Sequence, residues 1–168
     1  YPVLIDQLIS RGEFLTSYTP YQAEASQGSL QAFFEFQSQI ARLTGLDIAN
    51  ASLYEGATAV AEAALLAINT SKHSDLLVAS TLHPEYIAVL RTVLSDLPVT
   101  LTILDAIDGR IAPEIVKAAV TDNTAAVIVQ SPNVWGQIED WTGCFEAVHT
   151  CDKAVAIAVF NPIACGML

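Results

Sequence analysis

Short apolar runs alternate with helix-forming stretches from residue 76 onward. Four runs rich in Leu, Val, Ile and Ala predict buried strands, at residues 76–80, 99–104, 124–130 and 154–160. Three helical stretches separate them, at residues 84–94, 113–120 and 144–150. Strands that alternate with helices over short loops form parallel sheets with helices on both faces. This order predicts an α/β fold, a three-layer sandwich with a mostly parallel sheet.

The first part of the chain has a different pattern. Apolar side chains recur at helical spacing over residues 29–43, Gly45 follows as a C-cap, and an Ala-rich helix is predicted at residues 57–68. We divide the 168 residues into an N-terminal helical or extended segment, 1–48, and an alternating β/α core, 49–168, of one domain. The chain starts without Met and stops soon after a strand, so we expect an internal piece of a longer, incomplete domain. No G-x-G-x-x-G follows the first strand, so a dinucleotide fold lacks its fingerprint.

Composition limits the partners. Hydrophobic residues make up 52% of the chain and charged residues 15%, and the mean hydropathy is +0.43. We therefore expect apolar surface that is covered by the rest of a longer chain or by a partner subunit. The formal net charge is −11 and the basic residues form no cluster, which argues against nucleic acid and membrane partners. No apolar run reaches the ~20 residues that span a bilayer, and no signal peptide is visible.

The cysteines and histidines indicate no metal site. Cys144, Cys151 and Cys165 lack C-x-x-C spacing, which predicts reduced thiols in a cytoplasmic protein. The three histidines lack metal-ligand spacing with carboxylates. Neither Ser26 nor Ser80 has the context of a nucleophilic serine, so we nominate no catalytic residue.

Gly56, Ala57 and Thr58 form the clearest candidate binding motif. They stand where a turn opens onto the predicted Ala-rich helix. Free backbone N–H groups and the positive end of the helix dipole favour a bound anion such as phosphate at such a place. The Thr58 hydroxyl adds a donor. Taken alone, the same residues also fit an ordinary turn and cap.

Other polar residues follow the predicted strands. His83 follows the first strand, Asn133 lies in the Gln-Ser-Pro-Asn run after the third, and Asn161 follows the fourth. Ligands of open α/β sheets bind at the carboxyl ends of the strands, so these residues are expected to converge with Gly56 on one crevice. Each alone is ordinary: a histidine after a strand is commonly a cap, and Ser-Pro-Asn is a turn signal. For the pair Glu139-Asp140, a cap at the entry to a helix is the expected role.

Several blocks of sequence carry a family resemblance along nearly the whole chain. They are Tyr18-Thr19-Pro20-Tyr21-Gln22, Ser26-Gln27-Gly28, Asn50-Ala51-Ser52, Tyr54-Glu55-Gly56-Ala57-Thr58-Ala59, His83-Pro84-Glu85-Tyr86, Gln130-Ser131-Pro132-Asn133, Ile138-Glu139-Asp140 and Asn161-Pro162. In this order they resemble the glycine cleavage system P-protein, glycine dehydrogenase (decarboxylating), in its first half or separate subunit 1.

The resemblance implies the large domain of a fold-type I transferase that depends on pyridoxal phosphate (PLP). It implies phosphate at Gly56, Ala57 and Thr58, a ring-stacking role for His83, and cofactor contacts for Asn133 and Asn161. In such enzymes a carboxylate near the position of Asn161 normally holds the pyridinium nitrogen of PLP. An Asn cannot stabilise the protonated ring as an anion does, which puts the electron-sink role of the cofactor in doubt here. None of the lysines follows a predicted strand. The resemblance implies that the Schiff-base lysine lies on the second subunit, as in split P-proteins, and truncation of this chain stays open as another explanation.

The same resemblance implies partners. They are glycine dehydrogenase subunit 2, the lipoyl H-protein and glycine as substrate, in a homo- or hetero-oligomer. Tyr18, Thr19, Pro20, Tyr21 and Gln22 are expected at an interface or active-site loop. The isolated chain is expected to be inactive and to behave poorly alone. Two alternatives stay open: a fragment of another fold-type I PLP enzyme, such as an aminotransferase or desulfurase, and a catalytically inactive assembly module.

Overall fold

A computed structural model of the protein describes residues 2–15, 18–19, 21–23 and 26–166. Contacts within the chain divide it into two compact units, Tyr1–Ser52 and Leu53–Leu168. The sequence pattern predicted this boundary after residue 48.

The first unit is helical. It contains α1 (Val3–Ile9), α2 (Gly12–Leu15) and α3 (Gly28–Thr44), and no residue of these three helices is buried. The longest, α3, is the helix predicted at residues 29–43. It ends at Gly45, whose positive φ of 73° lets its N–H bond the Ala41 carbonyl, as expected of a C-cap.

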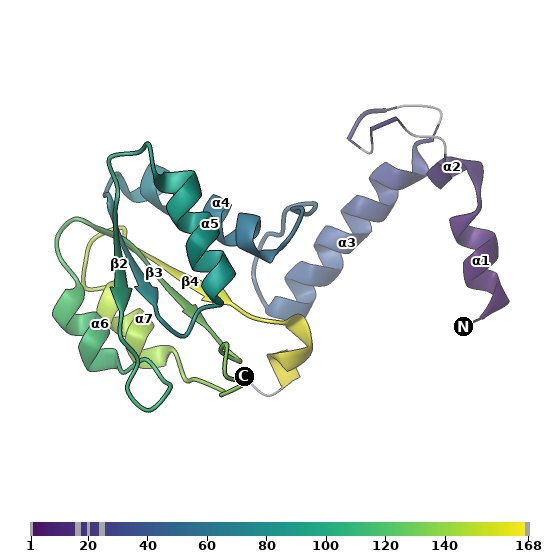
Figure 1. The fold of residues 1–168 in the computed structure, drawn as a ribbon. Helices are drawn as coiled ribbons and strands as arrows, with labels where there is room; N and C mark the ends of the chain where they lie inside the picture. Colours follow the sequence, from purple (N-terminus) through teal and green to yellow (C-terminus); the bar gives the residue numbers. More distant parts are fainter. Residues whose placement is uncertain (1, 16–17, 20, 24–25, 167–168) are drawn as a thin grey trace. The chain divides into compact units, whose positions relative to one another are not determined.

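The second unit carries the sheet (Figure 1). Its elements are α4 (Gly56–Ser71), β1 (Asp75–Ala79), α5 (Pro84–Leu94), β2 (Thr100–Leu104), α6 (Pro113–Ala119), β3 (Thr124–Gln130), α7 (Thr142–Val148), β4 (Val155–Val159) and the 3-10 turn η1 (Pro162–Gly166). Within the part of the chain that the structure describes, we find no helix with the length and apolar character needed to traverse a bilayer.

The predicted sheet is confirmed. The four strands stand in the order β2-β1-β3-β4, and all three pairings are parallel. Because the central strands β1 and β3 are buried along nearly their whole length, they read as continuous apolar runs in the sequence. All four strands end at the same edge, here called the carboxyl edge.

Two apolar clusters give the three layers. Leu76 and Val78 of β1 pack with α4 and α5 on one face of the sheet, whereas Leu77 and Ala79 pack with α6 and α7 on the other. Figure 1 shows the two helix pairs on opposite sides. The α/β three-layer prediction is therefore confirmed, with side chains that alternate between the faces as in any strand.

The helix starts depend on local caps. The His83 ring accepts a hydrogen bond at Nδ1 from the Glu85 N–H, 3.3 Å away, and Pro84 occupies the first turn of α5. Asp140 accepts one from the Thr142 N–H at 2.9 Å, so α7 begins at Thr142 and ends at Val148. The sequence placed this helix at residues 144–150, two residues too late at each end. Hydrogen bonding from Thr142 holds the pKa of the Asp140 carboxyl below its usual value.

The layered core supplies a first prediction. Leu90 of α5 is fully buried in the cluster with α4 and β1, whereas Val93 on the same helix is exposed. We expect Leu90→Ala to lower the free energy of unfolding by about 2–5 kcal/mol, because it removes apolar contacts and leaves a cavity. Val93→Ala should change it by no more than about 0.5 kcal/mol. Urea unfolding followed by circular dichroism measures both, and equal effects would contradict this packing.

Candidate functional site

The carboxyl edge brings together the start of α4 and the loop after β1. Tyr86, in the first turn of α5, places its hydroxyl against Gly56, and a Cβ at position 56 would collide with it. Glycine is required there by this close approach. The Tyr86 ring also lies 5.1 Å from the His83 ring, centroid to centroid. Gly56 and His83 therefore both lie close to Tyr86.

The first turn of α4 already holds an anion. The Glu55 carboxylate accepts hydrogen bonds from the Ala57 N–H and the Thr58 N–H, each at 2.6 Å. The Thr58 hydroxyl donates to the Glu55 carbonyl at 3.1 Å. The Ala57 and Thr58 N–H groups, two of the predicted phosphate donors, are thus satisfied by the residue that precedes the helix. Sequence reasoning missed this role of Glu55, although an acidic N-cap is a common signal.

Glu55 is charged and exposed. Hydrogen bonds from Thr58, and then from the Ala57 backbone, hold the pKa of its carboxyl below its usual value. Its contribution to stability is therefore present above the carboxyl's ordinary pKa and is lost as the pH falls through the lowered value in the folded protein.

A hydrogen bond from His83 connects the loop after β1 to the end of β3. The backbone N–H of His83 donates to the Gln130 side-chain oxygen at 2.9 Å, and the Gln130 amide nitrogen donates to the Pro132 carbonyl at 3.2 Å. The ring is partly exposed beside Tyr86. His83 acts as a helix cap in this structure, and its stacking on a cofactor stays a prediction.

Asn133 is 5% exposed, and its side chain is fully engaged within the chain. Its amide nitrogen donates to the Gly109 carbonyl and to Glu139, each at 2.8 Å, and its oxygen accepts from the N–H groups of Trp135 and Gln137. Both donors and both acceptor positions of the amide are occupied. These contacts support a structural role, and the contact of Asn133 with a cofactor stays a prediction.

The sequence predicted that Glu139 and Asp140 together cap the entry to a helix, and for Glu139 this prediction is wrong. Asp140 alone caps α7, whereas Glu139 is 5% exposed and accepts from the Ile111 N–H at 2.7 Å as well as from Asn133. Burial first, and then the charge of Glu139, raise the pKa of the nearby Cys144 thiol to about 11. Local sequence signals could not predict the contact of Glu139 with Ile111, because the two residues lie 28 positions apart.

Asn161 stands at the same edge, after β4. The Ser131 N–H donates to the Val159 carbonyl at 3.0 Å, which fixes the end of β4 beside the loop after β3. The Asn161 side chain is exposed, and its oxygen accepts from the Ile163 N–H at 3.0 Å, where η1 begins. Its predicted contact with a cofactor remains a prediction.

The Tyr18–Gln22 block lies in the first unit, and Pro20 falls outside the described residues. Tyr18 is 91% exposed, and Gln22 is exposed too. The Tyr21 ring stacks on Phe33 of α3 at 5.9 Å, and Thr19 is half-buried. The exposed tyrosines support the interface role proposed below.

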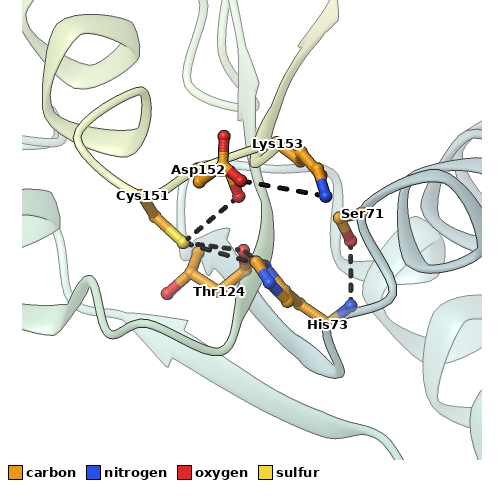
Figure 2. A network of polar contacts seen from close by, with 6 residues as sticks. All are labelled: Ser71, His73, Thr124, Cys151, Asp152 and Lys153. Carbon is orange, nitrogen blue, oxygen red and sulfur yellow. Dashed lines mark hydrogen bonds and ion pairs between the residues drawn. The ribbon is translucent and has the colours of Figure 1, made fainter.

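A second polar cluster lies at the opposite edge of the sheet, where Cys151 approaches His73 (Figure 2). Cys151 Sγ is 3.7 Å from His73 Nδ1, and that same nitrogen is 3.0 Å from the Thr124 carbonyl. Only a protonated Nδ1 can bond a carbonyl oxygen, so this nitrogen cannot take the thiol proton. The pair is not a Cys–His nucleophile, and the described residues contain no group of three metal-ligating side chains.

The lysines lie away from the carboxyl edge. Lys72 follows the end of α4 and Lys153 precedes β4, both at the edge where the strands begin, and Lys117 is in the last turn of α6. Lys72 Nζ donates to Asn69 at 2.9 Å, and Lys153 lies 3.9 Å from its exposed neighbour Asp152.

Known proteins match this chain over its full length. A family model described as glycine cleavage system P-protein matches residues 1–168. The chain is 47% identical over 167 residues to the probable glycine dehydrogenase (decarboxylating) subunit 1 of Bacillus subtilis, and 44% over 169 residues to that of Koribacter versatilis. Each comparison covers 99% of this chain but only 37% and 38% of the relative, respectively.

Solved structures agree. A crystal structure of glycine decarboxylase (P-protein) of the glycine cleavage system, in inhibitor-bound form, has a TM-score of 0.87 and 47% identity, over 99% of this chain and 37% of that one. An aspartate aminotransferase from Rhizobium meliloti has a TM-score of 0.60 at 16% identity, over 91% of this chain and 38% of its own, which shows shared fold alone.

The fold-type I prediction is confirmed. The full-length sequence match and the shared structure show that this chain belongs to the glycine cleavage system P-protein family.

Proposed function

We propose that this chain forms part of a PLP-dependent glycine dehydrogenase that decarboxylates glycine and passes the aminomethyl group to a lipoyl H-protein. The family match along all 168 residues carries the proposal. The chain spans 37–38% of the length of the relatives above, so their activity comes to it only as a proposal. Free, buried Cys144 and Cys151 support a reducing compartment such as the cytoplasm.

The carboxyl edge fits the phosphate of PLP in its donor set. The Ala57 and Thr58 N–H groups already hold a carboxylate at 2.6 Å, and a phosphate oxygen needs the same donors. Glu55 would have to leave for phosphate to enter, because two anions cannot share these donors. The partly exposed His83 ring would flank the group. Bound PLP supplies an electron sink for the charge left on carbon when carbon dioxide departs.

We assign the Schiff-base lysine to another polypeptide of the complex. The placement of Lys72, Lys117 and Lys153 away from the carboxyl edge supports an attachment outside these 168 residues, and the resemblance to subunit 1 favours the second subunit. The chain would then contribute shape, hydrogen bonds and charge around a site whose covalent attachment lies on the second subunit.

The first unit supports the existence of such a partner. Its three helices bury no side chain, and large apolar side chains such as Val3, Leu4, Leu15 and Phe34 are more than half exposed. Apolar surface of this extent in a water-soluble assembly is normally covered by protein. We propose that this surface, with Tyr18 and Tyr21, contacts the second subunit.

A second candidate role is a structural subunit that holds no cofactor at all. The internal engagement of Glu55 and Asn133 favours it, since their hydrogen bonds complete the fold without any ligand. The two candidates differ in whether PLP contacts this chain.

Activity tests the family proposal against a fragment of another fold-type I PLP enzyme. We expect this chain alone to release no carbon dioxide from carboxyl-labelled glycine, because its lysines do not reach the carboxyl edge. Adding glycine dehydrogenase subunit 2 and lipoyl H-protein should restore release. Release by the chain alone, or none with all three components, would contradict the assignment.

A cofactor titration tests the division of roles. We expect the absorbance band of lysine-bound PLP only after the second subunit is added. Borohydride reduction followed by peptide mass spectrometry should then find the label on the second subunit. Label on Lys72, Lys117 or Lys153 would place the attachment in this chain and overturn the assignment.

Glu55 tests whether the start of α4 binds anions. We expect Glu55→Gln to let inorganic phosphate shift the amide resonances of Ala57 and Thr58, because the neutral side chain removes a competing negative charge. The unchanged protein should show smaller shifts at neutral pH and larger ones below the lowered pKa of Glu55. Two-dimensional NMR of labelled protein measures this.

The matched control is Glu85→Gln, which removes an exposed carboxylate from the first turn of α5 instead. It should leave the phosphate response of Ala57 and Thr58 unchanged. Equal responses in both variants, or none in either, would remove the start of α4 from the proposed site.

A further inference from the structure

The chain itself engages nearly all polar groups of His83. The backbone N–H of His83 donates to the Gln130 side-chain oxygen at 2.9 Å. Its carbonyl accepts from the N–H groups of Tyr86, at 2.9 Å, and Ile87, at 3.2 Å. The ring atom Nδ1 accepts from the Glu85 N–H at 3.3 Å. These bonds fix the backbone of His83 and one edge of its imidazole ring.

The contact at Nδ1 determines which ring nitrogen carries the proton. A neutral imidazole has one N–H, so a nitrogen that accepts a hydrogen bond leaves the proton on the other nitrogen. His83 is therefore held in the tautomer with the proton on Nε2. A ring with protons on both nitrogens could not accept the bond from the Glu85 N–H, and α5 would lose this cap.

His73 shows the opposite arrangement in the same chain (Figure 2). Its Nδ1 lies 3.0 Å from the Thr124 carbonyl oxygen, which can only accept a hydrogen bond. The proton of a neutral His73 ring is therefore on Nδ1. The two histidines differ in tautomer because their Nδ1 atoms meet different backbone groups, and His73 can serve as an internal reference for His83.

The Nε2 atom of His83 is left open by the fold. Within the part of the chain that the structure describes, Nε2 has no hydrogen-bond partner and is not one of the buried polar atoms that lack one. The ring is partly exposed, and the Tyr86 ring lies 5.1 Å from it at an angle of 39°. His83 thus presents one N–H donor at the surface on a ring whose other edge is tied down.

The neighbouring groups at this corner of the carboxyl edge also donate hydrogen bonds. The N–H groups of Ala57 and Thr58 already hold a carboxylate at 2.6 Å. Tyr86, beside the His83 ring, places its hydroxyl against Gly56 at the start of the same helix. A ligand that enters here meets N–H groups, and an anionic oxygen is the acceptor that N–H groups bind most strongly.

We infer that His83 donates a hydrogen bond from Nε2 to an anionic oxygen of the ligand at the carboxyl edge. This role uses the edge of the ring, whereas the stacking that the resemblance implies uses its face. The inference rests on the proposed function, in which PLP and glycine meet at this edge. The oxygen belongs to the cofactor or to the glycine carboxylate, and the measurements below distinguish the two. A donor that is fixed beforehand loses little entropy on binding.

The tautomer is tested without any ligand. The sample is this polypeptide in the form in which the cell makes it, with isotope-labelled imidazole nitrogens. We expect two-dimensional NMR to show the proton on Nε2 of His83 and on Nδ1 of His73. The His83→Asn variant assigns the signals of His83 by their loss. A proton on Nδ1 of His83 would overturn the inference.

Three substitutions separate the donor from the ring face and from the cap. His83→Gln keeps an N–H donor near the place of Nε2 and loses the face, whereas His83→Phe keeps the face and loses the donor. Both lose the acceptor for the Glu85 N–H, so both should lower the urea midpoint of unfolding alike. His83→Asn keeps this acceptor, because Asn is a good N-cap, but it has no face and no donor that reaches the place of Nε2.

Affinity is measured on the assembly with glycine dehydrogenase subunit 2, from the absorbance of the cofactor. We expect His83→Gln to bind its ligand at least about tenfold more tightly than His83→Phe or His83→Asn, because a hydrogen bond to a charged group contributes that much. If the acceptor belongs to the cofactor, this order appears when PLP alone is titrated. If it belongs to glycine, the order appears only when glycine is titrated into the assembly loaded with PLP.

The outcomes separate this inference from the proposed function. If the unchanged assembly binds no PLP, the proposed function fails. If it binds PLP, and His83→Phe binds both PLP and glycine at least as tightly as His83→Gln, the donor role is wrong while the function stands. Equal affinities of the unchanged protein and all three variants for both ligands would also overturn the donor role.

Discussion

The central strand pair β1–β3 is the constraint on which the second unit depends. Both strands are buried on both faces, so each requires a helix layer above and below. Their parallel pairing, extended by β2 and β4, also forces every strand to end at one edge. Loops from four strands and the first turn of α4 are thus gathered in one place by packing alone. The chemistry that the edge can perform follows from which side chains those loops carry.

The loops at this edge satisfy their own polar groups. Glu55 caps α4, Asn133 fills all four positions of its amide, and Asn161 begins η1. Such bonds replace the water or ligand that backbone N–H groups would otherwise need. The edge is therefore ordered by the chain alone. The groups that it leaves outward include the His83 ring, which is partly exposed, and the Trp135 indole.

The sheet was predictable because its signals are local. Apolar runs and helical spacing identified all four strands and five helices, and Pro84 and Gly45 marked helix ends that the structure confirms. The α7 start was misplaced by two residues because its N-cap is Trp141, which makes no side-chain cap hydrogen bond and so gives no local signal for the first residue of the helix. The short helices α1 and α2, of seven and four residues, are too short for helical periodicity to be read, although α1 is rich in apolar residues. The role of Glu139 depends on Ile111, which the fold brings close from 28 residues away.

Burial decides how readily the hydrogen bonds around the predicted cofactor site can be exchanged for those of a ligand. The Glu55 carboxylate is exposed, so its hydrogen bonds can be exchanged for those of water or another anion at little cost. Asn133 is buried with Glu139, and removing either partner would leave a buried donor or charge unpaired. A ligand can therefore displace the first contact at a lower cost than the second. The start of α4 stays chemically available, whereas Asn133 is committed to holding the loop that carries Trp135.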